Sequence, residues 1–225
     1  DPDSGYCGPD CTNDVWVLAN ADGTGGSPTW TQLSPTGTPP STRGYHSAVY
    51  DALSNRMIVY GGDPQIGFCN GAVNDTWVLT NADGTGGPPA WIQLAPTGSA
   101  PDLRQGPMAV YDSVTNRMMV FGGRINACQA LSNNVWVLTN ANGLTGTPTW
   151  TQLSPTGPLP AGRQGHNAVY DTAYNRMIVF GGTTTGANND VWVLSNANGL
   201  GGTPAWVQLS PTGGPPAPRV FPTAV

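Results

Sequence analysis

The sequence repeats itself four times, and this repetition limits the folds that the chain can adopt. Eight tryptophans form two series that run in phase with a series of four arginines. Successive members of every series are 61, 59 and 56 residues apart, and each arginine follows the first tryptophan of its copy by 27 residues. Such a period indicates an array of similar supersecondary units. The series are Trp16, Trp77, Trp136 and Trp192; Trp30, Trp91, Trp150 and Trp206; and Arg43, Arg104, Arg163 and Arg219.

Each unit is predicted to form four short β-strands. In the first full copy these are residues 44–50 (GYHSAVY), 56–62 (RMIVYGG), 74–80 (NDTWVLT) and 91–98 (WIQLAPTG). The runs are rich in β-branched and aromatic residues and are separated by Asp, Asn, Gly and Pro, which favour turns. Four antiparallel strands per unit predict an all-β fold in which each unit is one blade of a propeller.

The repeated motifs also resemble a known family. The pattern R-x-G-H-x-A-V-Y-D, then N-R-M-I-V-F-G-G, N-D-V-W-V-L and W-T-Q-L is similar to the kelch repeat and covers essentially the whole chain. The resemblance implies a kelch-type β-propeller region over 1–225, with four-stranded antiparallel blades in about four repeats of 56–61 residues. The expected repeats are 44–104, 105–163 and 164–219, with partial repeats at 1–43 and 220–225.

The two ends of the chain predict a ring that does not close on itself. The first residues, DPDSGYC, match DPQIGFC at 63–69, and the last, RVFPTAV, match RGYHSAV at 43–49. The stretch equivalent to residues 50–62, which holds a whole second strand, therefore has no counterpart between the ends. The chain lacks an initiator Met and a signal peptide, which indicates a processed or partial chain. Two interpretations stay open: a segment of a larger propeller, or a ring completed by a neighbouring chain.

Composition excludes several kinds of chemistry. All 8 basic residues are Arg and all 13 acidic residues are Asp, so there is no Lys and no Glu. A Schiff-base lysine, a phosphate-loop lysine, a metalloprotease glutamate and a calcium loop closed by glutamate are therefore impossible. The net charge of -5 argues against nucleic acid. A membrane span is not expected, because no run of 18 apolar residues occurs.

The four cysteines, Cys7, Cys11, Cys69 and Cys128, all fall in the loop of variable length that precedes the third strand. An even count in a loop-rich chain predicts disulfides and an oxidising compartment. Three pairings are open, of which Cys7 with Cys11 and Cys69 with Cys128 is favoured. A zinc site is disfavoured because paired Cys-x-x-Cys spacing is absent.

Arginine and histidine supply the candidate binding residues. The arginines at 43, 104, 163 and 219 precede the innermost strand, where they either bond carbonyls of the neighbouring blade or present guanidinium groups to an acidic or glycan ligand. His46 and His166 open the first strand in two copies, but Pro107 and Pro222 replace them in the others. A hydrogen-bonded histidine near the centre of the ring is favoured there over a metal pair.

The turns are expected to be structural. The four Asn-Ala-Asp/Asn-Gly hairpins have no acidic closing residue, so calcium is disfavoured and no cofactor is expected. Arg56, Arg117 and Arg176 are expected to pair with Asp51, Asp112 and Asp171 across the first turn of each unit. Asn74 lies in a glycosylation sequon, and the repeated Ser-Pro-Thr-Gly segments offer sites for O-glycans.

These features together predict a non-catalytic module that binds or supports other molecules. The composition is similar to that of secreted bacterial kelch-repeat proteins, so the expected location is extracellular or at the cell surface. The expected partner is a protein or a glycan, held by the variable and arginine-bearing loops. One alternative is a self-assembling filament or surface subunit. Another is a sugar-modifying enzyme or oxidase of kelch type, for which no ligand set is visible in the sequence.

Overall fold

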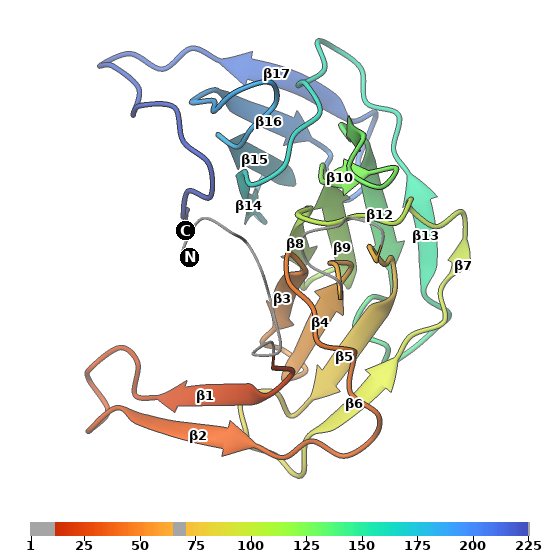
Figure 1. The fold of residues 1–225 in the computed structure, drawn as a ribbon, viewed down its shortest axis with the longest axis vertical. Coiled ribbons are helices and arrows are strands. Elements are labelled where there is room, and N and C mark those ends of the chain that lie inside the picture. The colour runs from red at the N-terminus through yellow and green to blue at the C-terminus, as the bar shows by residue number, and fades with distance from the viewer. Residues whose placement is uncertain (1–11, 65–70, 225) are drawn as a thin grey trace.

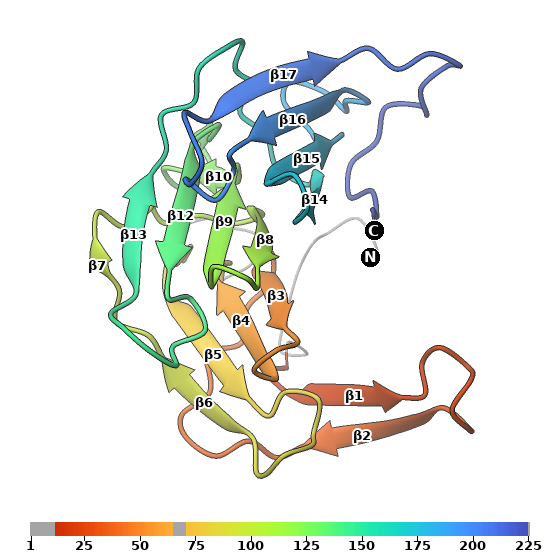
Figure 2. The same cartoon turned by 180° about the vertical axis from the view of Figure 1, so that it is seen from behind.

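The chain forms an arc of antiparallel sheets in a computed structural model that describes residues 12–64 and 71–224 (Figures 1 and 2). Every regular element in the described residues is a strand, as the repeats predict. None of these residues belongs to a helix that could span a membrane.

Three complete blades follow the predicted order of four strands. Their inner strands β3, β8 and β14 lie next to one another and line the concave side of the arc (Figure 1). The blades are β3 (Ser47–Asp51), β4 (Arg56–Tyr60), β5 (Thr76–Thr80) and β6 (Ala90–Gln93); β8 (Met108–Asp112), β9 (Arg117–Phe121), β12 (Val135–Thr139) and β13 (Thr149–Gln152); and β14 (Asn167–Asp171), β15 (Arg176–Phe180), β16 (Val191–Ser195) and β17 (Ala205–Leu209).

A hairpin of β1 (Val15–Ala19) and β2 (Thr29–Leu33) supplies the third and fourth strands of a further blade. It stands at one end of the arc, and the third complete blade stands at the other (Figures 1 and 2). Two shorter strands, β10 (Arg124–Ile125) and β11 (Ala130–Leu131), form a small hairpin within the variable loop of the second blade.

The core lies between the blades, because neighbouring sheets pack face to face. Trp150 of the second blade packs on Tyr60 of the first, with ring centroids 5.1 Å apart, and Trp206 packs on Phe121 at 5.2 Å. Six tryptophans of the complete blades are at most 8% exposed. Full burial of such a side chain contributes about 2–3 kcal/mol, so the in-phase tryptophans hold neighbouring blades together.

The arginines and the glycine pairs form a second link between blades. Arg163 Nη1 donates to the carbonyl of Gly181 in its own blade at 2.9 Å, while the Arg163 carbonyl accepts from the N–H of Gly123 in the preceding blade at 2.8 Å. Gly122, at φ +71°, allows this approach, because a Cβ there would lie 2.6 Å from the Arg163 carbonyl oxygen. The constant 18-residue interval between arginine and glycine pair is thereby explained.

A third link lies at the opposite edge of the blades. Asn142 Nδ2 donates to Asp51 Oδ2 at 2.9 Å, and Asn198 Nδ2 donates to Asp112 Oδ2 at 2.8 Å, each across a blade boundary. Burial alone would raise the pKa of Asp51, but hydrogen bonds from Asn142, Ser54, Tyr111 and the Leu53 N–H together lower it. The buried carboxylates are therefore kept charged by the asparagine of the next blade.

Two of the arginines in the first turns act differently from the sequence-based prediction. Arg56 and Arg117 lie opposite Asp51 and Asp112 in the strand register, but they form no ion pair with them. Arg56 Nη1 instead donates to the carbonyl of Asn142, and Arg117 Nη1 donates to that of Asn198. The expected pairing is wrong for these two because the next blade brings a carbonyl within reach. It is also wrong for Arg176, which forms no ion pair with Asp171 and whose guanidinium lies over the Tyr174 ring.

Candidate functional site

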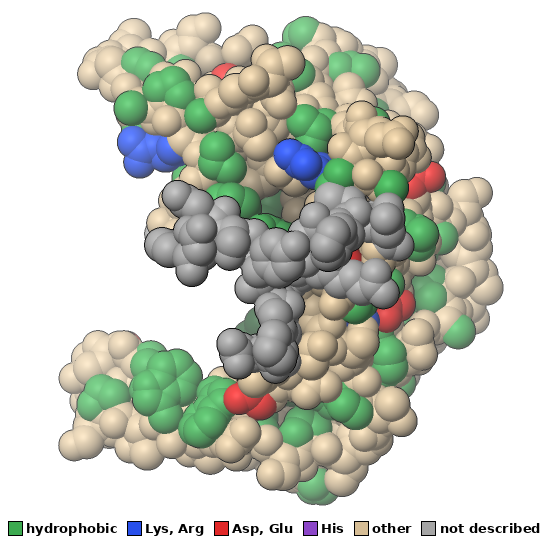
Figure 3. All heavy atoms as spheres, in the orientation of Figure 1, with side chains coloured by type: hydrophobic (Ala, Val, Ile, Leu, Met, Phe, Trp, Pro, Cys, Tyr) green, Lys and Arg blue, Asp and Glu red, His purple; other side chains and the backbone are tan. Residues whose placement is uncertain are grey.

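The face with the variable loops carries the candidate site, at the hairpin β10–β11. The first residue of this hairpin, Arg124, is bound by its backbone to Gln105, through hydrogen bonds of 2.8 and 3.1 Å. Figure 3 shows this face, on which charged side chains stand apart as small patches among uncharged ones. The hairpin extends the second blade at the face with the variable loops and leaves its four strands paired as in the other blades.

Three consecutive residues at the tip of β10–β11 are in the left-handed region of backbone conformation. Their φ angles are 53° for Asn126, 51° for Ala127 and 67° for Cys128. Non-glycine residues adopt this region at a cost, and such strain concentrates at functional sites. Gln105 Nε2 donates to Cys128 Sγ, which helps to fix the tip against the neighbouring segment.

A hollow of about 280 Å³ lies on one side of the hairpin. Arg124 and Asp102 supply its charges, and the exposed Leu103 supplies apolar surface. The lining consists of Ala72, Asp102, Leu103, Gln105, Arg124, Asn126, Ala127 and Cys128.

A second hollow of about 400 Å³ lies on the other side and shares Arg124 and Cys128 with the first. Its wall continues through β11 to Ala161 and Gly162, which lead into the third blade, and to Thr184 and Thr185. The guanidinium of the half-buried Arg124 forms no hydrogen bond or ion pair with any residue that the structure describes. A single available cation thus stands between two concave surfaces.

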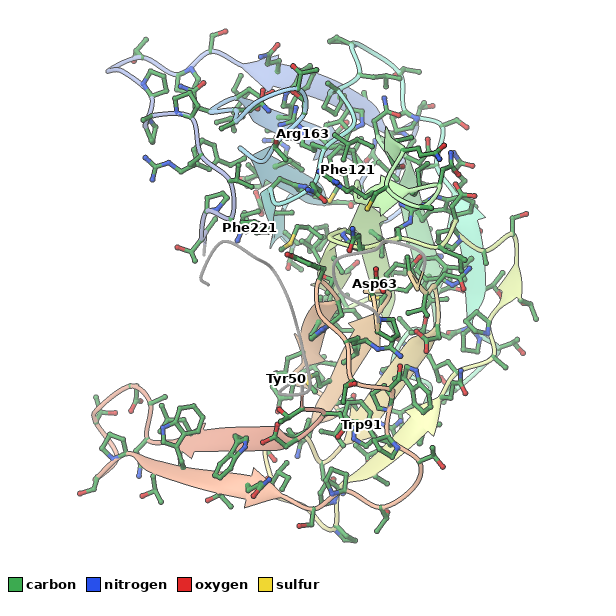
Figure 4. The ribbon with its side chains drawn as sticks, in the orientation of Figure 1. Tyr50, Asp63, Trp91, Phe121, Arg163 and Phe221 are labelled. Carbon is green, nitrogen blue, oxygen red and sulfur yellow. The ribbon has the colours of Figure 1, made fainter. Side chains whose placement is uncertain are left out.

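Three of the four arginines named from the sequence are buried beneath this face. Arg43 and Arg163 each form an ion pair within their own blade, with Asp75 and Asp190, and Arg104 donates to the Gly122 carbonyl at 2.9 Å. Figure 4 shows Arg163, together with Phe121 of the preceding blade, in the interior of the arc. Arg219 is exposed, and its guanidinium donates only to the nearby Ala217 carbonyl among the described residues. The carbonyls that the three buried guanidinium groups bind belong to their own blades, so the expected bond to the neighbouring blade is wrong. A ligand role for the series stays a prediction.

The two histidines occupy equivalent positions with different surroundings. His166 is 2% exposed and packs edge-on against Phe121, with its Cε1 over Gly122 of the preceding blade. Burial, aided by the charge of Arg163, lowers the pKa of His166 to about 3, so the ring is neutral. Neither ring nitrogen has a hydrogen-bond partner among the described residues, contrary to the expected hydrogen-bonded histidine. His46 lines a hollow of about 110 Å³ beside β1–β2, where desolvation and Arg43 lower its pKa.

The remaining candidate residues have structural contacts or lie outside the described residues. Cys128 is in a disulfide, but Cys7, Cys11 and Cys69 lie outside the described residues, so the pairing stays a prediction. Asn74 Nδ2 donates to the Pro101 carbonyl at 2.8 Å. The same bond recurs at Asn13, Asn133 and Asn189, so the sequon has a structural role, and its glycosylation stays a prediction.

The hairpins that carried the calcium alternative are closed by their own side chains. Asp22 accepts from the N–H and the hydroxyl of Thr24, and Asp83 accepts from those of Thr85. Within 12–64 and 71–224 there is no group of three His, Cys or Asp side chains placed to hold a metal ion.

Sequence reasoning missed Arg124 itself. The residue follows the glycine pair, where the equivalent residues are Asp63 and Thr183, so it belongs to no repeated series. Its signal was the position at the start of the variable loop, which the repeats mark by their changing length.

Comparison with known proteins gives a consistent result for the family. A family model described as the KLHDC2/KLHL20/DRC7 Kelch-repeats domain matches residues 4–145 and 113–225. Kelch domain-containing protein 3 is 30% identical over 196 residues in Homo sapiens and 29% identical over 196 residues in Bos taurus. Each match covers 84% of this chain and 46% of the relative, so the chain spans less than half the length of these relatives.

Two further comparisons extend this result. Host cell factor homolog hcf-1 of Caenorhabditis elegans is 29% identical over 211 residues, which cover 87% of this chain and 25% of that protein. The solved structure of YjhT aligns with a TM-score of 0.61 and 14% identity, over 89% of this chain and 60% of that one. At this identity the likeness shows a common fold.

Proposed function

Because this chain belongs to the kelch-repeat family, we propose that it is a binding module whose loop face holds a protein partner around Arg124. The main support for this function is that two hollows meet at the Arg124 guanidinium, which has no hydrogen bond or ion pair with the described residues. A planar guanidinium binds carboxylates through two parallel hydrogen bonds, and the hollow beside it exposes Leu103. The geometry suits a segment that presents an Asp or Glu next to an apolar side chain.

The proposed role is binding rather than catalysis. Asp102 is the one carboxylate in the described lining of either hollow, and no histidine belongs to that lining. General acid–base chemistry usually needs two titratable groups placed around the substrate. The lining residues therefore support recognition of a partner.

An array of peptides and glycans tests the proposal directly. Peptides with an acidic residue beside an apolar one are expected to bind, and their Asn or Gln counterparts are expected to bind at least tenfold more weakly, as for a lost charged contact. Arg124→Gln is expected to cause the same loss. Arg219→Gln removes the same charge one blade further along and is expected to leave the affinity unchanged.

Two results would overturn this function. If Arg124→Gln bound the same peptides as tightly as the unaltered protein does, Arg124 would not be part of the binding site. If only glycans bound, the proposed protein partner would be refuted, and the loop face would be retained as the binding surface.

We also propose an extracellular or cell-surface location. The support is the disulfide at Cys128, since such bonds persist mainly in oxidising compartments. Alkylation of the natural protein before denaturation, followed by mass spectrometry, is expected to leave Cys128 unlabelled. A labelled thiol would contradict the location.

A further inference from the structure

The boundary between the first and second complete blades holds four buried polar atoms that have no hydrogen-bond partner among the described residues. They are Arg104 Nη2, Trp136 Nε1, the Tyr60 hydroxyl and Thr76 Oγ1. All four residues are at most 6% exposed. Tyr60 and Thr76 lie opposite each other in the register of β4 and β5, and Tyr60 packs in the same cluster as Trp136. Unpaired buried polar atoms are rare in folded proteins, so the group points to a ligand.

The guanidinium of Arg104 has the same orientation as the other two buried guanidinium groups of its series. In each blade Nε donates to the carbonyl two residues earlier at 3.1–3.2 Å, and Nη1 donates to the carbonyl of the first glycine of the pair at 2.9–3.0 Å. In the other two blades Nη2 and the tryptophan Nε1 converge on a single oxygen, Asp75 Oδ2 or Asp190 Oδ2, at 2.6–2.9 Å. Arg104 Nη2 and Trp136 Nε1 therefore aim at the place where their counterparts bind a negative charge.

The second blade supplies no such charge from its own residues. Asn134 stands at the position of the aspartate. Arg104 forms no ion pair with any carboxylate that the structure describes, and Asp102 accepts from it through a backbone carbonyl. Burial lowers the pKa of Arg104, against the opposing effects of Tyr60 and Asp102, but a guanidinium stays charged at neutral pH. A buried cation without a counter-charge is unfavourable.

The same boundary has two hydroxyl groups that the next boundary lacks. Phe121 and Val135 occupy, in the second blade, the positions that Tyr60 and Thr76 occupy in the first. At the boundary with Phe121 and Val135 the arginine has its aspartate. The hydroxyls thus accompany the loss of the carboxylate, and a hydroxyl can donate to an anion.

We propose that this boundary binds one chloride ion between Arg104 Nη2 and Trp136 Nε1. The hydroxyls of Tyr60 and Thr76 face the same boundary and supply further donors, and the Asn134 amide can donate where an aspartate would repel the anion. A small anion suits the site because the other blades place a single carboxylate oxygen at these two nitrogens. A water molecule could accept both hydrogen bonds, but it would leave the guanidinium charge uncompensated. Chloride thereby takes the part that the aspartate has in the other blades.

A chloride titration at constant ionic strength tests the site. Sodium chloride replaces sodium gluconate, whose anion is too large for the place of one oxygen, and the midpoint of thermal unfolding is measured. An ion that binds only the folded state stabilises it, so chloride at about ten times its Kd is expected to raise the midpoint by about 3–6 °C. Asn134→Asp places a carboxylate at the same two donors and is expected to abolish this dependence on chloride.

The two hydroxyls can be removed by substitutions that the next boundary already contains. Tyr60→Phe and Thr76→Val copy Phe121 and Val135, so the variants are expected to fold. Together they are expected to raise the Kd for chloride about tenfold, because the anion loses hydrogen bonds. The control Tyr50→Phe removes a hydroxyl from a side chain that is 48% exposed, and it is expected to leave the Kd for chloride unchanged.

A crystal structure with bromide in place of chloride locates the ion. The expected result is an anomalous peak within hydrogen-bonding distance of Arg104 Nη2 and Trp136 Nε1. Equal unfolding midpoints in chloride and gluconate for the unaltered protein would overturn the proposal, as would a chloride dependence that Asn134→Asp does not change. A structure in which the Asn134 amide oxygen accepts from both nitrogens, with no bromide beside them, would overturn it as well.

Discussion

Asn134 is the position at which one substitution should most improve this fold. In the first and third blades the equivalent residues, Asp75 and Asp190, pair with the buried arginine of the blade and also accept from a tryptophan Nε1, at 2.7 and 2.6 Å. In the second blade Asn134 takes this place, and Arg104 Nη2 and Trp136 Nε1 are buried without a hydrogen-bond partner among the described residues. Asn134→Asp supplies both donors with an acceptor.

The expected gain follows from the environment of Asp190. Its side chain is 20% exposed, so a carboxylate there keeps part of its hydration. A hydrogen bond to a charged group contributes about 1.5–3 kcal/mol, and the desolvation of Arg104 is already present in the unaltered protein. After the remaining desolvation of the new carboxylate is subtracted, we expect Asn134→Asp to stabilise the protein by about 2 kcal/mol. For a chain of this size the midpoint of thermal unfolding then rises by about 4–8 °C.

The pH dependence separates this mechanism from a general effect of charge. Burial would raise the pKa of Asp190, but hydrogen bonds from Arg163 and Trp192 and the charge of Arg163 lower it below 3.8. A lowered folded pKa gives stability that is complete above the unfolded pKa and is lost as the pH falls through the folded pKa. The gain from Asn134→Asp is therefore expected in full at pH 7 and is expected to shrink as the pH falls below 3.8.

Calorimetry of the unaltered protein, Asn134→Asp and Asp190→Asn tests the predicted gain in stability. Asp190→Asn makes the third blade resemble the second and is expected to lose about 3 kcal/mol, because it leaves Arg163 buried without its carboxylate. If Asn134→Asp at pH 7 is neutral or destabilising while Asp190→Asn is destabilising, the arginine of the second blade does not need a carboxylate, and the reasoning fails.

Three further predictions concern the boundaries between blades. Asn198→Asp places a second carboxylate against the buried Asp112 and is expected to lower the free energy of unfolding by at least about 3 kcal/mol at pH 7, but by less at pH 4, where the pair of carboxylates retains a proton. The control Asn198→Ala is expected to lose less at pH 7 and to show no such pH dependence, and equal losses for the two variants at pH 7 in calorimetry would contradict this. Gly157→Ala, at φ +84° with a Cβ 2.5 Å from the Trp206 carbonyl oxygen, is expected to lose about 1–3 kcal/mol in urea unfolding, whereas Gly186→Ala, with nothing within 4 Å, is expected to be neutral. The pKa of His166 is lowered from 6.5 to about 3, so between these pH values the unfolded chain takes up a proton that the folded protein does not, and the free energy of unfolding falls by up to about 1.4 kcal/mol per pH unit as the pH is lowered. His166→Met is expected to flatten the plot of unfolding free energy against pH, and an unchanged slope would refute the lowered pKa of His166.

The strands were predictable because the repeats show the same pattern several times. The run 56–62 ends as β4 at Tyr60, where the two glycines begin, and the third strand of each blade starts where the tryptophan series predicts. The first strand begins later than residue 44, because Tyr45 adopts a left-handed conformation with φ 55°. Glycines at the equivalent positions 106 and 165 carry this signal in the sequence.

The side of the sheet on which an arginine lies was not predictable from its period. A series in phase with the repeats fits a buried structural role, which the sequence favours, but it also fits a row of exposed ligands. What decides between them is the partner, and the glycine carbonyl that binds Arg163 lies 18 residues away in the sequence. The contact forms only when the first strand and the end of the second strand close one blade.

Departures from the repeat are more informative about function than the repeat itself. In a linear array the energy of each unit comes mainly from contacts with its neighbours, so residues that serve the boundaries recur in every copy. Arg124, by contrast, stands where the other copies have Asp63 and Thr183, and its guanidinium forms no hydrogen bond or ion pair with the described residues. This departure from the repeat leaves a charge available to a second molecule.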